Sequence, residues 1–158
     1  MTAPSTASVN FPYAAMSLAA ITYLDETNPA KQQADMSSAL SALDASAGGP
    51  WTLRWGPAID AGILVFVAQS ASAGWAVAIR GSLSSAAAAG FFSNWIEDAD
   101  AVSQQPWLYP QSVAGAQIAS GTNEALDAIM GLTDPTTDLS LLDYLRSALP
   151  ASGGSLLV

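Results

Sequence analysis

The sequence contains no cysteine and no histidine. Without cysteine the chain can form no disulfide and has no thiol nucleophile. Without histidine it cannot complete a Ser-His-Asp triad, a Cys-His pair or a histidine metal site from its own residues. Nothing in the chain indicates a cofactor or a metal, because no glycine-rich phosphate loop is present and the oxygen-rich stretch Asp134–Asp138 has too few ligands for calcium.

Basic residues are also scarce: four lysines and arginines stand against thirteen acidic residues, which gives a net charge of −9. Such a surface repels phosphate backbones and anionic lipids, so we expect no nucleic-acid partner. The longest apolar run, residues 61–68, is far shorter than the roughly 20 residues of a membrane helix. The first nine residues lack the basic start and apolar core of a secretory signal, and localisation stays open.

The chain is rich in apolar residues, which make up 51% of it, while charged residues make up only 11%. A chain of 158 residues with this balance is expected to fold as one packed domain, residues 1–158. Helical and strand-like patterns alternate, which predicts an α/β fold. The expected helices span residues 10–24, 30–45, 113–131 and 138–149, and the expected strands span 51–55, 62–69, 75–80, 99–103 and 155–158.

Local signals support the first elements. Asn10 is placed to cap the first helix, Asn28 or Thr27 is placed to cap the second, and Pro12 suits a first helical turn. Apolar spacing in the first helix predicts a buried face. The strand over 62–69 is apolar throughout, so we expect it to be buried on both faces. Its short link to the strand over 75–80 predicts an antiparallel hairpin. The predicted buried face of the first helix consists of Tyr13, Met16, Ala20, Ile21 and Leu24.

The strand over 75–80 opens into an unusual loop. It ends at Arg80-Gly81-Ser82, and small residues follow up to the aromatic pair Phe91-Phe92. The stretch Asn94-Trp95-Ile96-Glu97-Asp98 comes next. A buried strand that leads into an apolar loop is typical of one wall of a site for an apolar ligand.

The ordered pair Ala78-Ile79-Arg80-Gly81-Ser82 and Asn94-Trp95-Ile96-Glu97-Asp98 resembles the class 3 lipases, the fungal triacylglycerol lipase type of α/β-hydrolase. The resemblance implies an α/β-hydrolase fold and hydrolysis of carboxylic esters through an acyl-enzyme. It places Ser82 at the oxyanion position and Asp98 at the acid that supports the oxyanion loop. Arg80 would then be a buried cation at the strand end that pairs with a carboxylate, for which Asp98 is the nearest candidate in the motif. It makes residues 83–98 a lid that contacts a lipid or small ester substrate, with Leu83, Phe91, Phe92 and Trp95 as the contacting side chains.

The resemblance also concerns the end of the sequence. In the family, a strand like the one over 155–158 leads into Gly-His-Ser-Leu-Gly, the turn that carries the nucleophile. The resemblance therefore implies that this chain is the N-terminal half of the fold, with the triad beyond Val158 and the C-terminal half as its partner. One stretch departs from the family pattern: residues 118–122 carry Ala119 and Thr122 where the family has histidine and an aromatic residue.

Other interpretations stay open. Ser82 could simply end a strand, and Asp98 could be a solvated acid in an acidic run. Residues 83–98 could form an ordinary surface helix. The whole chain could be a non-catalytic α/β interaction module with an apolar binding loop, or part of a serine hydrolase for phospholipids or polyesters.

Overall fold

The computed structural model describes residues 9–24, 28–60, 63–80, 103–107, 113–149 and 156–158. These ranges contain both helices and strands, which fits the predicted α/β fold. The helices are α1 (Phe11–Ile21), α2 (Pro29–Ala42), the 3₁₀ turn η1 (Ala45–Ala47), α4 (Ser120–Gly131) and α5 (Leu141–Ala148). The strands are β1 (Trp51–Asp60), β2 (Ile63–Ser70), β3 (Gly74–Ile79), β4 (Gln104–Pro106), β5 (Gln117–Ala119) and β6 (Leu156–Leu157).

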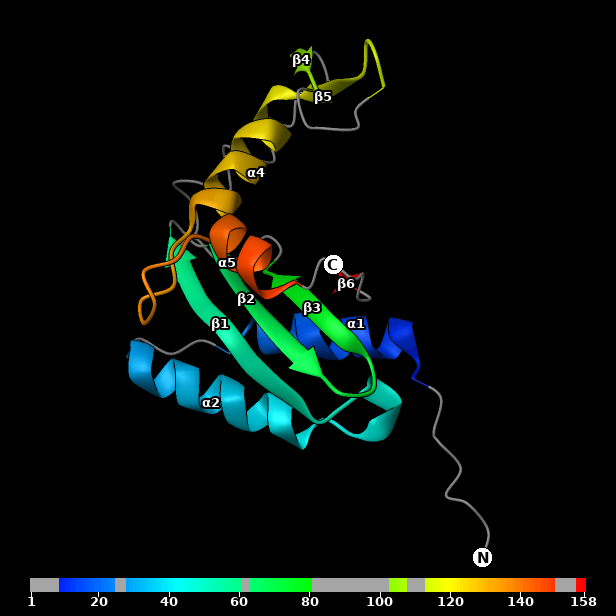
Figure 1. Cartoon of the computed structure of the whole chain (residues 1–158), viewed down its shortest axis with the longest axis vertical. Coiled ribbons are helices and arrows are strands. Elements are labelled where there is room, and N and C mark those ends of the chain that lie inside the picture. Colours follow the sequence, from blue (N-terminus) through cyan, green and yellow to red (C-terminus); the bar gives the residue numbers. More distant parts are fainter. Residues whose placement is uncertain (1–8, 25–27, 61–62, 81–102, 108–112, 150–155) are drawn as a thin grey trace, which may run out of the picture.

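Four strands form the main sheet in the order β1-β2-β3-β6 (Figure 1). β2 and β3 pair antiparallel, from Ser70 opposite Gly74 to Val65 opposite Ile79, so the predicted hairpin is confirmed. β1 is antiparallel to β2, whereas β6 is parallel to β3. The carboxyl ends of β1, β3 and β6 therefore lie at one edge of the sheet.

The central strand β2 is buried on both faces, as its apolar run predicts. Leu64, Phe66 and Ala68 pack in one cluster with residues of α1 and α2. The alternate residues of β2 pack in a second cluster with residues of α4 and α5. Helices thus cover both faces of the sheet, α1 and α2 on one side and α4 and α5 on the other. The alternate residues are Ile63, Val65 and Val67.

The helix caps are confirmed, but the predicted buried face of α1 is right only at Ile21. The side chain of Asn10 accepts a hydrogen bond from the N–H of Tyr13, and the side chain of Asn28 accepts hydrogen bonds at the start of α2. Met16 is 72% exposed, whereas the buried residues of α1 are Ala14, Leu18 and Ile21. Apolar residues surround this helix on all sides, so their spacing selects no single face.

Strand β1 is twice as long as predicted. The sequence Gly56-Pro57 is a typical strand breaker, but β1 passes through it with register shifts on both sides of Trp55. Gly56 has a φ of +80°, which glycine adopts without strain. An edge strand tolerates such irregularities because its outer side makes no ladder hydrogen bonds. The segment before α5 covers this side: the Gly56 N–H donates to the carboxylate of Asp134, and the Trp55 indole N–H donates to the Leu139 carbonyl at 3.0 Å.

The predicted helix over 113–131 begins later than expected, at Ser120. Residues 117–119 instead form β5, which pairs antiparallel with β4. Figure 1 shows α4 extending away from the main sheet, with β4 and β5 at its far end. α5 also begins later than the predicted residue 138, because Ser140 caps it and its first residue is Leu141. Within the described ranges, no helix has both the length and the apolar character to cross a bilayer.

Candidate functional site

The best candidate site lies where the parallel strands β3 and β6 end. Trp75 pairs with Leu156, and Ala76 pairs with Leu157. Sites in α/β proteins form outside the carboxyl ends of parallel strands, because loops from neighbouring strands meet there. The two strands that the lipase resemblance names, the one before Ser82 and the one at the end of the sequence, are therefore neighbours.

Arg80 is the last described residue on this side of the site. Its backbone N–H donates to the carbonyl of Leu64 at 2.8 Å, which fixes the end of β3 onto β2. Arg80 as a whole is only 7% exposed, in agreement with the buried strand-end cation that the lipase resemblance implies. Burying a guanidinium is costly unless hydrogen bonds or an opposite charge compensate it.

The candidate site residues themselves fall in one stretch, 81–102, which lies outside the described residues. This holds for the oxyanion candidate Ser82, the supporting acid Asp98 and the whole lid. Their roles stay predictions, and so does the pairing of Arg80 with Asp98. The lid residues concerned are Leu83, Phe91, Phe92 and Trp95.

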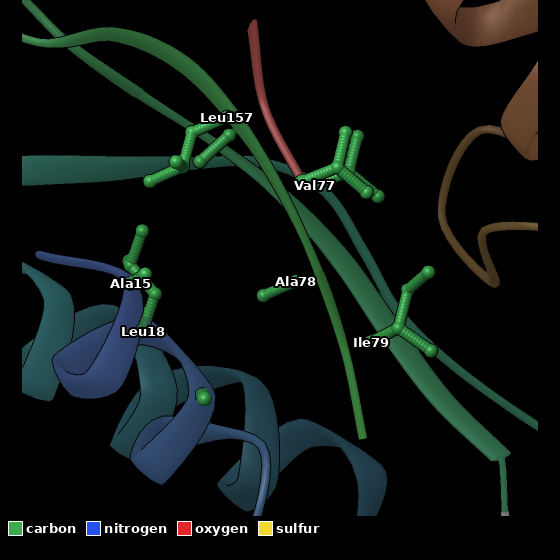
Figure 2. A pocket seen from close by; sticks show the side chains of 9 residues that line it. Ala15, Leu18, Val77, Ala78, Ile79 and Leu157 are labelled. Carbon is green, nitrogen blue, oxygen red and sulfur yellow. The ribbon is translucent and has the colours of Figure 1, made fainter. Parts of the chain in front are cut away.

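An apolar hollow of about 200 Å³ lies beside this strand pair, on the face that α1 covers. Figure 2 shows Ala78 and Leu157 beside the hollow, with Ala15 and Leu18 of α1 opposite them. No polar side chain lines it, so it can accept only apolar groups. Its full lining is Ala15, Leu18, Ala19, Ala76, Val77, Ala78, Ile79, Leu157 and Val158.

A second, wider hollow of about 450 Å³ lies at the carboxyl end of β1, against the last turns of α4. It mixes the apolar residues Ile59 and Leu132 with the acids Asp60 and Asp127. Two carboxylates are too few for a metal site, and the described part of the chain holds no group of three or more acidic, histidine or cysteine residues that could bind one.

The most buried acid of the described residues is Asp134, which is 3% exposed. Burial pushes its pKa upward, but hydrogen bonds from the backbone N–H groups of Gly56, Thr136 and Thr137 outweigh this, and the pKa lies below its ordinary value. A carboxylate held by several backbone donors is poorly suited to accept a proton. Asp134 therefore fixes the turn 134–137 to β1, and the pattern Asp-Pro-Thr-Thr signals that turn, not a calcium loop.

The structure was compared with known proteins. No protein family matches the sequence, and no curated protein matches it. Among solved structures, the crystal structure of M37 lipase is similar, with a TM-score of 0.59 and 22% sequence identity. The match covers 85% of this chain but only 43% of the lipase chain, so this chain spans less than half of that protein's length. The chain therefore has a lipase-like α/β fold.

Proposed function

We propose that this chain is the oxyanion-forming half of a serine carboxylic-ester hydrolase, a triacylglycerol lipase or an esterase. One observation carries the proposal: β3, the strand that precedes Ser82, and β6, the strand at the end of the sequence, are parallel neighbours, so their carboxyl ends lie at the same edge of the sheet. The lipase-like fold supports the proposal. So does the motif Arg80-Gly81-Ser82, because its arginine is buried at the strand end.

The proposed reaction needs three kinds of group. A serine oxygen bonds to the ester carbonyl carbon while a histidine takes the serine proton, and the carbonyl oxygen becomes an oxyanion. The alcohol then leaves with that proton, and water releases the acid from the acyl-enzyme. Because these 158 residues contain no histidine, the nucleophile, the histidine and their aspartate belong to the part proposed to follow Val158.

This chain would supply the remaining group. Ser82 would donate its backbone N–H and hydroxyl to the oxyanion, and Asp98 would hold the oxyanion loop in place. Residues 83–98 would act as a lid whose apolar side covers the site in water and meets the substrate when open. The lid side chains proposed to contact substrate are Leu83, Phe91, Phe92 and Trp95. The net charge of −9 favours neutral esters over anionic phospholipids.

The first test is to express the complete reading frame and to assay it on esters of graded acyl length. We expect hydrolysis and covalent labelling of a single serine by a fluorophosphonate. A reading frame that ends at Val158, or that lacks a Gly-x-Ser-x-Gly motif, would contradict the proposal. That result would favour the non-catalytic interaction module with an apolar binding loop.

The second test addresses Ser82. Ser82→Ala in the intact protein should lower kcat by about 10²–10³-fold with little change in KM, because the lost donor acts on the transition state. Ser38→Ala, on the exposed side of α2, is the matched control and should retain full activity. Equal kcat values for the two variants would remove Ser82 from the oxyanion role.

A further inference from the structure

Helix α1 has the composition of a helix that is buried on all sides. Its eleven residues include no charged side chain, whereas α2 carries Lys31 and Asp35 on its surface. Helices that are apolar all round normally lie inside a protein. In this structure, however, α1 buries only one side, and large apolar side chains such as Phe11 and Met16 are 49% and 72% exposed.

The unburied side of α1 is continuous with the apolar hollow beside β6. Ala15 and Ala19 line the hollow from α1, and Leu157 of β6 and the following residue Val158 also line it. Figure 2 shows Ala15 and Leu157 at the hollow. Val158 is 80% exposed. The small side chains at Ala15 and Ala19 let another element approach α1 closely. Together, these residues form an open apolar groove without charge.

The topology indicates which kind of element can fill this groove. The connection from β3 to β6 passes over the face covered by α4 and α5. Parallel crossovers are almost always right-handed, so a parallel strand added beyond β6 would place its crossover helix on that same face. The groove lies on the opposite face, with α1, and the helix directly after β6 would not cover it.

We propose that this groove seats an apolar or amphipathic helix supplied by a later part of the remaining half of the fold. The inference rests on the proposed function, in which such a half exists. A helix fits better than an acyl chain, because the exposed apolar surface extends past the hollow to Phe11 and Met16. The groove is therefore an internal interface of the intact hydrolase.

Single-cysteine variants test the inference, since these residues contain no natural cysteine. Ala19→Cys lies in the groove, and Ala34→Cys, on the exposed side of α2, is the matched control. The rate of alkylation by iodoacetamide is measured at each position by peptide mass mapping, in residues 1–158 and in the intact protein. We expect Ala19→Cys to react at least about tenfold more slowly in the intact protein, because a seated helix must open first. Ala34→Cys should react equally in both.

The other outcomes distinguish this inference from the proposed function. Fast alkylation of Ala19→Cys in an intact, ester-cleaving protein would overturn the groove proposal and leave the function standing. A reading frame that ends at Val158 would overturn both. Protection of Ala19→Cys in residues 1–158 that rises with protein concentration would identify a second copy as the occupant, and protection by octanoate would identify an acyl chain. Either result would overturn the proposal that a helix fills the groove.

Discussion

At the scale of single residues, Asp134 has a clearer role than any other acid in the described chain. Its carboxylate accepts backbone N–H groups from its own turn, at 2.6 Å from Thr136 and 2.9 Å from Thr137, and a third from Gly56 of β1. The residue therefore joins two segments that are distant in sequence. Its burial and its charge serve the fold, so a buried acid here does not indicate an acid–base catalyst.

Replacing Asp134 by asparagine should destabilise the protein by about 1–3 kcal/mol, because hydrogen bonds to a charged acceptor are the strong ones. Urea unfolding followed by tryptophan fluorescence measures the loss. Asp35→Asn is the control, since Asp35 only pairs with Lys31 at 2.9 Å on an exposed helix surface and should change stability by less than about 1 kcal/mol. Equal losses in the two variants would contradict the role assigned to Asp134.

The same carboxylate should make stability depend on pH. Its pKa is lower in the folded protein than its ordinary value of 3.8, so the unfolded chain binds more protons between the two values. The stabilisation is fully present above about pH 4–5 and is lost as the pH falls through the folded pKa. The free energy of unfolding should therefore fall less steeply below pH 4 in Asp134→Asn than in the parent. Parallel pH curves would show that Asp134 titrates alike in both states.

At the scale of the element, β1 depends on one glycine. A Cβ at Gly56 would lie 2.7 Å from the Val65 carbonyl oxygen and 2.9 Å from the Ala58 nitrogen, and φ is +80°. Gly56→Ala should cost about 1–3 kcal/mol or more, since both the clash and the backbone angle oppose it. Thermal unfolding measures this cost. At Gly131, an added Cβ meets nothing within 4 Å, so Gly131→Ala should be neutral or stabilising, and a large loss there would be unexpected.

The sequence predicts elements well where local chemistry decides them. Asn10 and Asn28 mark helix starts, and the apolar run of β2 shows burial on both faces. Predictions fail where contacts between distant residues decide the local structure. Strand β5 forms before α4 because β4 pairs with it. Strand β1 continues past Gly56-Pro57 because Asp134 holds its outer side. The parallel pairing of β3 with β6 joins residues more than 75 positions apart, and only the family resemblance anticipated their meeting.

The candidate site is predictable to a similar extent. The motif identified Arg80 as a buried strand end, and this is confirmed. Periodicity could not identify the groove on α1, because a helix that is apolar on every side has no preferred face in its sequence. Only the packing of α1 against the rest of the protein reveals that Met16 is exposed while Leu18 is buried.

At the scale of the whole molecule, stability should be uneven. The apolar clusters form around β2, whereas β4 and β5 lie at the far end of α4, away from the main sheet (Figure 1). Regions with few buried contacts open locally, without global unfolding. Hydrogen exchange followed by mass spectrometry should find the slowest amides in β2 and much faster exchange in β4, β5 and the first turn of α4. Uniform protection across these elements would contradict this picture.

The outer side of β1 has a consequence for assembly. The N–H of Gly56 is occupied by Asp134, and Pro57 has no N–H, so two successive residues of this border strand offer no donor to an incoming chain. Strand-by-strand polymerisation requires such donors in an unbroken row. An incoming strand that lies along β1 therefore meets an interruption at residues 56 and 57, which makes fibril-like stacking on this border less favourable than on a border with an unbroken row of donors.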